Sequence, residues 1–274
     1  MTQGTVGRLR GDASGHGLPP AVVVLAAGQG SRLGPAGARA PKWLVPVEGT
    51  PIAHFHLRAL RADLSAWSRL VAVTGHRSGA FDAARLSSLA GRPCELVHNE
   101  QYAACNNWLS LARALDHLEA TRWTGAVCVL NSDLLLPPER LHALLADARR
   151  RPATNVLAID SRRPLTEEAM KVVLAGEEPA VVDIGKGTLR GGPTAEFIGV
   201  SVLAAAHVPA LRRILAAFEQ DDARKGEWYE AAYREAIDAG VPFSAFEIAT
   251  DDWVEIDDER DLRAAAAIAG RYGA

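Results

Sequence analysis

Short apolar runs alternate with segments of helical periodicity through the first 160 residues. Four runs of small and β-branched residues have the length of buried strands, at 21–26, 70–74, 125–130 and 155–159. Apolar residues recur at helical spacing between them, at 51–64, 107–118 and 138–150. Strands that are apolar on both faces are typical of parallel sheets covered by helices. The alternation therefore predicts an α/β fold with a doubly wound, mainly parallel, Rossmann-like sheet.

The pattern changes after residue 160. Three further strand-like segments lie at 170–174, 180–184 and 195–201, and helical periodicity returns at 209–218 and 227–239. A short strand at 253–256 precedes an alanine-rich terminal helix. We therefore expect a mixed sheet flanked by helices. No internal repeat or long linker interrupts the chain, which indicates a single domain over residues 20–274 after a flexible polar tail, residues 1–19.

The composition of the chain argues against several classes of function. The formal net charge of -3 argues against a nucleic-acid partner, because contact with a phosphate backbone needs a basic face. No apolar run reaches the roughly 18 residues of a membrane span, so we expect no membrane partner. The first residues lack the apolar core of a secretory signal. Three cysteines without metal-type spacing are typical of reduced thiols, which predicts a cytoplasmic protein.

A glycine-rich turn, residues 25–34, follows the first strand directly. Glycines there allow positive φ angles and let backbone N–H groups approach an anion. A strand-to-helix turn needs small residues as well, so the turn alone is weak evidence of a phosphate site. The dinucleotide fingerprint fails because its third glycine would fall at Leu33. The Walker pattern fails because no Gly-Lys-Ser/Thr follows.

The spacing from this turn to Pro41-Lys42 is more specific. The stretch LAAGQGSRLGPAGARAPK, residues 25–42, resembles the signature of sugar-phosphate nucleotidyltransferases and of the related phosphocholine and phosphonate cytidylyltransferases. The resemblance implies a nucleotidyltransferase domain of the GT-A-like type, in which Arg32 and Lys42 neutralise the triphosphate and act as the catalytic cations. The nucleotide-binding residues that it implies are Leu25, Ala26, Ala27, Gly28, Gly30, Ser31, Asn106 and Ser132.

Two acidic positions follow predicted strands. Asp133 comes after the run at 125–130 and so lies at the carboxyl edge of the sheet, where ligands of open α/β sheets bind. As an isolated Asp it would more simply be a turn or helix-cap residue. The second position lies in W-x-E-I-D-x-x-x-D-L, residues 253–262, which resembles the closing motif of the phosphocholine cytidylyltransferase branch. The resemblance makes Asp133 and Asp257 the ligands of Mg²⁺, an ion that prefers oxygen donors. Strand alternation puts Glu255 on the side of Asp257, as a support or acceptor contact.

The sequence in the middle of the chain distinguishes between branches of the family. Residues 99–111 resemble the N-x-x-Y-x-x-x-N-N-x-x-S-L stretch of the phosphocholine and aminoethylphosphonate cytidylyltransferases, where hexose-1-phosphate enzymes usually carry a Gly-Thr-Ala type sequence. Asn106 could also simply cap the following helix. The resemblance implies that Tyr102 and Asn107 contact the acceptor.

Lysine is rare in this arginine-rich chain, which draws attention to its few positions. Lys171 and Lys186 lie in segments that look like this branch, and they would flank the anionic group of the acceptor. Without the family argument they could equally be exposed strand lysines. Glu196 and Trp228 match weaker family positions in the acceptor site. Trp108, Trp228, Tyr229 and Trp253 could cage a cationic head group, although such aromatic residues more often belong to the core.

The sequence thus predicts a Mg²⁺-dependent enzyme that transfers CMP from CTP to a small phosphate- or phosphonate-bearing acceptor and releases pyrophosphate. Its partners would be the NTP and this acceptor. The nearest alternative is a sugar-1-phosphate nucleotidyltransferase that uses UTP, dTTP or GTP. A glycosyltransferase of the same topology would show Asp-x-Asp where this chain has Asn131-Ser132-Asp133. A non-catalytic nucleotide-binding protein would not need both acids. A homo-oligomer is compatible with the sequence, which carries no feature that reports oligomeric state.

Overall fold

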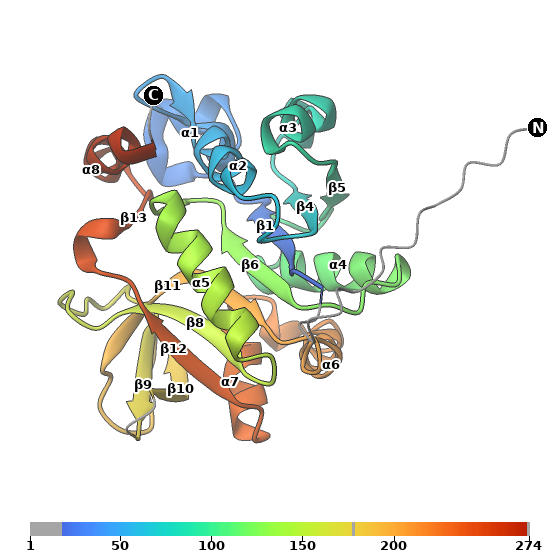
Figure 1. The fold of residues 1–274 in the computed structure, drawn as a ribbon, viewed down its shortest axis with the longest axis vertical. Coiled ribbons are helices and arrows are strands. Elements are labelled where there is room, and N and C mark those ends of the chain that lie inside the picture. Colours follow the sequence, from blue (N-terminus) through green and yellow to red (C-terminus); the bar gives the residue numbers. More distant parts are fainter. Residues whose placement is uncertain (1–17, 177–178, 273–274) are drawn as a thin grey trace, which may run out of the picture.

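A nine-stranded mixed sheet forms the centre of the molecule (Figure 1) in the computed structural model, which describes residues 18–176 and 179–272. Across the sheet the strand order is β5-β4-β1-β6-β11-β8-β12-β10-β9. In chain order the strands are β1 (Ala21–Ala26), β4 (Arg69–Thr74), β5 (Cys94–His98), β6 (Val127–Asn131), β8 (Asn155–Asp160), β9 (Lys171–Ala175), β10 (Ala180–Gly185), β11 (Ala195–Leu203) and β12 (Phe243–Glu247). Two short pairs stand apart from this sheet, β2 (Pro46–Val47) with β3 (Thr50–Pro51) and β7 (Leu134–Leu135) with β13 (Val254–Glu255).

Strand direction changes between the two halves of the sheet. Strands β5, β4, β1 and β6 are all parallel. Strand β11 then lies antiparallel between β6 and β8, β12 is again parallel to β8, and β10 is antiparallel to both β12 and β9. The prediction of a mainly parallel sheet that becomes mixed in its second half is therefore confirmed.

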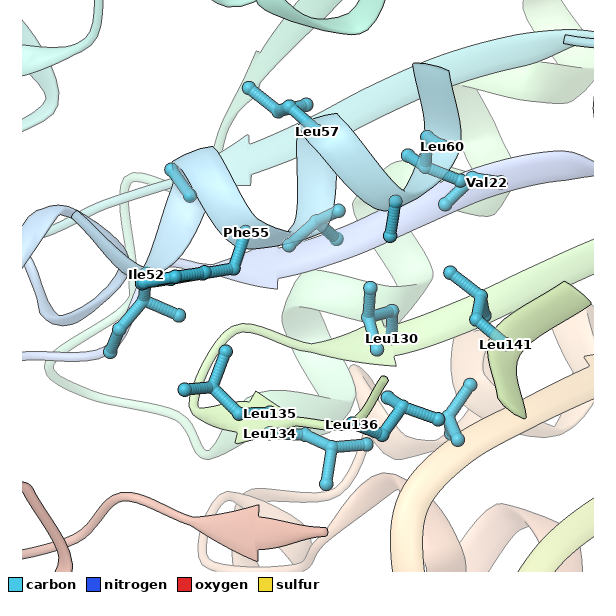
Figure 2. Packing of buried hydrophobic residues seen from close by; sticks show 14 of the residues in the cluster. Val22, Ile52, Phe55, Leu57, Leu60, Leu130, Leu134, Leu135, Leu136 and Leu141 are labelled. Carbon is cyan, nitrogen blue, oxygen red and sulfur yellow. The ribbon is translucent and has the colours of Figure 1, made fainter. Parts of the chain in front are cut away.

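Helices cover both faces of the sheet, because the strands are apolar on both sides. In β1, Val22 and Val24 face one apolar cluster while Val23 and Leu25 face the other. The first cluster contains residues of α2 (Ile52–Ala62), α3 (Ala83–Ala90), α5 (Pro138–Arg150) and α8 (Glu259–Ala269), and Figure 2 shows part of it. The second contains residues of α4 (Asn107–Ala120), α6 (Val208–Phe218) and α7 (Tyr229–Asp238). The short helix α1 (Gly34–Arg39) follows the glycine-rich turn.

Every strand and helix expected from the sequence is present, with ends that differ by a few residues. Helix α3 and strands β5 and β12 were not predicted. Helix α3 is short and is delimited by its caps, since the Asp82 side chain accepts from two backbone N–H groups and Gly91 closes it with a positive φ. The predicted tail lies outside the described residues except for residues 18 and 19. Within the described part of the chain, no helix is long and apolar enough to cross a bilayer.

The order of the strands reverses between β1 and β6. The chain runs from β1 outward through β4 to β5, and then returns to the other side of β1 as β6. Such a reversal leaves a gap at the carboxyl ends of the two central strands, where ligands of open α/β sheets bind. The glycine-rich turn follows β1 and Asp133 follows β6, so both predicted features lie at this edge.

Candidate active site

The short β7–β13 pair brings the two predicted acidic positions together. Glu255 is in register with Leu134, and the backbone N–H of Ile256 donates to the Asp133 carbonyl at 2.9 Å. The start of α8 fixes the other side of this junction. Asp258 and Asp261 form a capping box, and the Asp261 carboxylate also accepts from the Asp257 N–H at 2.9 Å. These backbone hydrogen bonds hold Asp133 next to Glu255 and Asp257, although Asp133 is far from them in the chain.

Three carboxylates meet at this junction. Oxygens of Asp133, Glu255 and Asp257 lie within 4.8 Å of one another. The Lys42 Nζ donates to Asp133 Oδ2 at 2.6 Å and to Asp257 Oδ1 at 2.7 Å. Although burial of the ammonium opposes its charge, these two carboxylates raise the pKa of Lys42 above its ordinary value. The site therefore favours the charged form of an ammonium that lies between two aspartates.

These oxygens fit a divalent cation. Asp133 Oδ1 is buried and has no hydrogen-bond partner, so this carboxylate retains a free acceptor within the cluster. All three groups are carboxylates, the donor type that Mg²⁺ prefers. The protein packed around the Glu255 carboxyl and the charges of Asp133 and Asp257 raise its pKa to about 8, although the residue as a whole is exposed. Glu255, expected to contact the acceptor, thus lies among the predicted metal ligands.

The glycine-rich turn lies against this cluster. Gly30 has φ +62°, the left-handed region that favours glycine, and a side chain at Gly37 would collide with the Gly30 carbonyl. Arg32 Nη2 lies 3.0 Å from Asp257 Oδ2, while 66% of its side chain is exposed. The turn therefore places one exposed guanidinium beside the carboxylates.

The remaining nucleotide-binding candidates differ in exposure. Leu25, Ala26, Ala27 and Ser132 are buried, Gly28 and Ser31 are exposed, and Gly30 is half-buried. Tyr102 lies across Gly75 from Ala27, since a side chain at Gly75 would meet both. This neighbourhood is the β1 and β4 edge beside the glycine-rich turn. The assignment of Tyr102 to the acceptor stays a prediction.

The adjacent asparagines join α4 to the segment before α7. Asn106 caps α4 by accepting from the Asn107 N–H, and it donates to the Gly226 carbonyl at 3.1 Å. The Asn107 side chain accepts from the Tyr229 N–H at 3.0 Å. The capping function of Asn106, the simpler of the two sequence interpretations, is present. Both side chains use hydrogen bonds to position α7.

A pocket of about 190 Å³ lies next to α7 and β10 and contains two of the predicted acceptor residues. The Lys186 Nζ lies 4.5 Å above the Trp228 ring and 3.4 Å from Glu168 Oε2. Glu230 also lines this pocket, and its Oε2 is buried without a hydrogen-bond partner. Burial raises the pKa of Glu230 to about 7, and the Asp133 charge acts in the same direction.

Lys171 and Glu196 face each other across β9 and β11. Lys171 Nζ donates to the Glu167 and Ala169 carbonyls at 3.0 and 3.3 Å. Burial raises the pKa of Glu196, while the positive charge of Arg163 opposes that rise. The Arg163 guanidinium lies 4.4 Å above the Trp253 ring. Glu196, at the start of β11, therefore has both basic neighbours and the acidic Asp160 near it.

A cage of four aromatic residues is not formed. Trp108, Tyr229 and Trp253 are all buried. Trp108 packs against Phe218, and the Trp253 indole N–H donates to Asp160 at 2.9 Å. Only Trp228 of the four is exposed at the pocket. The expectation that most of these residues belong to the core is confirmed.

The sequence indicates Glu230 only as part of the stretch 227–230, which resembles weaker family positions, and it does not single out Arg163. Glu230 carried a signal, because it lies among the apolar positions of its helix where a carboxylate is costly to bury. Arg163 carried none, since it lies in a polar segment between strands. A larger, mainly apolar hollow of about 280 Å³, lined by Leu18 and Pro20, lies at the amino edge of the sheet, away from the carboxylates.

Comparisons with known proteins identify relatives of this chain. A family model described as the MobA-like NTP transferase domain matches residues 22–235. CMP-5'-(3-aminopropyl)phosphonate synthase from Streptomyces rubellomurinus is 31% identical over 265 residues, which cover 92% of this chain and 39% of that protein. This chain thus spans less than half the length of that relative. A 2-aminoethylphosphonate cytidylyltransferase from Lancefieldella rimae is 26% identical over 193 residues, 70% of each chain.

A solved structure shares the fold. The CTP:phosphocholine cytidylyltransferase from Streptococcus pneumoniae superposes with a TM-score of 0.70 and 19% identity, covering 91% of this chain and 98% of that chain. A likeness at this identity establishes the mixed α/β architecture with helices on both faces of the sheet.

Proposed function

The chain belongs to the MobA-like NTP transferase family, and on that basis we propose that it transfers CMP from CTP to a small phosphonate- or phosphate-bearing acceptor. The observation that carries the proposal is the cluster of Asp133, Asp257 and Lys42 beside the glycine-rich turn. The cluster lies at the carboxyl ends of β1 and β6, the edge where open α/β sheets bind ligands. The preference for CTP rests on the names of the relatives, a CMP-phosphonate synthase and a cytidylyltransferase.

The reaction we propose is a direct displacement. An anionic oxygen of the acceptor attacks the α-phosphorus of CTP, the new P–O bond forms, and the bond to the departing pyrophosphate breaks. The acceptor oxygen is already ionised at neutral pH, so the protein supplies no general base. Catalysis then rests on positioning two anions and screening their repulsion.

The residues of the cluster have different roles in the proposed reaction. Asp133 and Asp257 would hold Mg²⁺, which when bound offsets negative charge on the reacting phosphate groups. Arg32, exposed beside Asp257, is available to the departing pyrophosphate. Lys42 keeps the two aspartates at a fixed separation and reduces their mutual repulsion. The glycine-rich turn would offer backbone N–H groups to the nucleotide.

The acceptor we favour carries a cationic end. Glu230 places a buried, unpartnered carboxylate oxygen at the pocket, and an ammonium group on the acceptor would satisfy its charge. Lys186 lines the same pocket, and Lys171 is in register with Gly185, the residue before Lys186, so both lysines suit the anionic end of the acceptor. Aminoalkyl phosphonates and phosphocholine-like compounds have both ends. The phosphate of an uncharged sugar has no cationic group that could pair with Glu230.

The test is pyrophosphate release with Mg²⁺, in which each NTP is crossed with aminoalkyl phosphonates, phosphocholine, phosphoethanolamine and hexose 1-phosphates. We expect release only with CTP and an acceptor that carries a positive charge. An Asp133→Asn variant, folded by circular dichroism, should be inactive. Release with a sugar phosphate and another NTP would move the protein to the sugar-phosphate branch. Binding of CTP without turnover of any acceptor would contradict the proposed transfer.

A further inference from the structure

A single histidine is buried in the otherwise apolar inner face of α2. His56 is 2% exposed and lies among Ile52, Phe55 and Leu60, which belong to the apolar layer in Figure 2. The Trp43 Nε1–H donates to His56 Nδ1 at 2.9 Å, and His56 Nε2 is bonded to the Leu134 carbonyl. An indole nitrogen can only donate, so Nδ1 must accept and Nε2 must carry the proton. The imidazole is therefore fixed in one tautomer by two different partners.

Each partner is the sequence neighbour of a site residue. Trp43 follows Lys42 within one turn of 3-10 helix, and Leu134 follows Asp133. Both partners are fully buried. The Lys42 and Asp133 side chains meet at 2.6 Å although 91 residues separate them in the chain. The His56 ring thus links the backbone segments that present the ammonium and the carboxylate.

Burial keeps this link neutral. It lowers the pKa of His56 to about 4, so the ring carries no charge near neutral pH and its tautomer stays matched to both partners. A leucine would fill the same apolar layer without a polar group that needs partners. The imidazole therefore contributes at this position through its two hydrogen bonds and not through apolar packing.

We propose that His56 is a positioning residue, which holds the Lys42 and Asp133 segments at the separation that the carboxylate site requires. It acts from behind the site, through Trp43 and Leu134, and contacts no substrate. The inference rests on the proposed function for its catalytic consequence. The structural part of the proposal, a fixed distance between the Lys42 ammonium and the Asp133 carboxylate, does not depend on which acceptor is used.

The test compares variants that remove these bonds with a matched control. His56→Leu removes both bonds, and Trp43→Phe removes only the indole N–H. Trp67→Phe is the control, since the buried Trp67 indole donates to the Leu60 carbonyl at 2.7 Å at the far end of the same helix. Each folded variant is assayed for kcat, for KM with CTP, and for Mn²⁺ affinity by electron paramagnetic resonance.

We expect His56→Leu to lower kcat and Mn²⁺ affinity about 10- to 100-fold, the range found when partners of metal ligands are removed. KM for CTP should change much less. Trp43→Phe should give a smaller loss in the same direction. His56→Gln keeps a donor near the Nε2 position and should recover part of the loss. Trp67→Phe should lower thermal stability but leave kcat and Mn²⁺ affinity unchanged.

A folded His56→Leu protein with wild-type kcat and Mn²⁺ affinity overturns the proposal. An equal loss of kcat in Trp67→Phe overturns it too, because the effect would then be one of general stability. If the wild type turns over no substrate pair or binds no Mn²⁺, the proposed function fails, and the crystal structure of His56→Leu decides the positioning claim. In that structure an unchanged Lys42 to Asp133 contact would refute it.

Discussion

Lys42→Met tests the electrostatic organisation of the site most directly. The substitution keeps most of the apolar stem and removes the ammonium that lies between Asp133 and Asp257. Lys42 is 9% exposed, and the two carboxylates retain 18% and 28% of their side-chain exposure. The variant therefore leaves two partly buried negative charges close to each other and to Glu255.

The magnitude follows from the burial. Loss of one partner from a buried ion pair costs about 3–5 kcal/mol, and the partial exposure of Asp257 favours the lower end, about 3 kcal/mol. For a protein of this size about 2–4 °C of Tm accompanies each kcal/mol, so Tm should fall by about 6–12 °C in the presence of EDTA. Pyrophosphate release should be abolished.

Magnesium should restore much of the lost stability. A cation present at about 100 times its Kd stabilises the folded state by about 2.7 kcal/mol. In the variant no ammonium competes for the carboxylate oxygens, so Mg²⁺ should raise Tm more than it does in the wild type. The assay is thermal unfolding by circular dichroism, with and without Mg²⁺. Lys225→Met, which removes a surface pair with Asp222, is the control and should show neither effect.

Two results would refute this reasoning. One is a Lys42→Met protein that melts in EDTA at the wild-type temperature, which would mean that the ammonium does not offset the carboxylate charges. The other is an equal rise in Tm with Mg²⁺ for both proteins, which would mean that lysine and metal do not share the same oxygens.

Three further predictions follow from buried groups. His56 binds a proton more readily in the unfolded chain, because its folded pKa of about 4 lies below the ordinary 6.5. Its contribution to stability should therefore be complete above about pH 6.5 and fall by up to about 3 kcal/mol as pH drops toward 4, and urea titrations of His56→Leu should lack this part of the pH dependence. Glu230→Gln should raise KM for a cationic acceptor about tenfold or more and leave KM for CTP unchanged in steady-state assays; an unchanged acceptor KM would remove Glu230 from the acceptor site. Gly199→Ala should lower Tm by several degrees in a thermal melt. The reason is that Gly199 has φ +91° and that a side chain there would meet the Asn131 amide at 2.7 Å. A Tm equal to that of the wild type would show that β6 and β11 can separate freely.

Much of the fold could be predicted because its central strands are buried on both faces. Runs such as 21–26 are apolar throughout, which only a covered parallel strand requires. Strands β5 and β12 were missed because their residues alternate in exposure and include charged or polar side chains. Helix α3 is too short for its periodicity to stand out from the surrounding loop.

The candidate site, too, could be predicted only in part from the sequence. Alternation along a strand predicts that Glu255 lies beside Asp257. Their carboxylates do lie together with that of Asp133, but β13 ends at Glu255, so strand alternation is not what places Asp257 there. The contact of Lys42 with both aspartates could not be predicted, because it depends on the pairing of β7 with β13. Each of these strands has two residues, too few to leave a periodic pattern. Likewise, nothing in the sequence indicates that His56 bonds to Trp43 and Leu134.

The β7–β13 pair also sets the moment at which the site can form during synthesis on the ribosome. Lys42 and Asp133 belong to the parallel half of the sheet, whereas Asp257 is made 124 residues after Asp133. At about 5–20 residues per second, some 6–25 seconds pass between these two aspartates. A nascent chain can therefore fold its first strands and present one carboxylate to Lys42 while it lacks the second. The carboxylate cluster closes only after the antiparallel half of the sheet has been made, so a partly synthesised chain does not have the complete cluster.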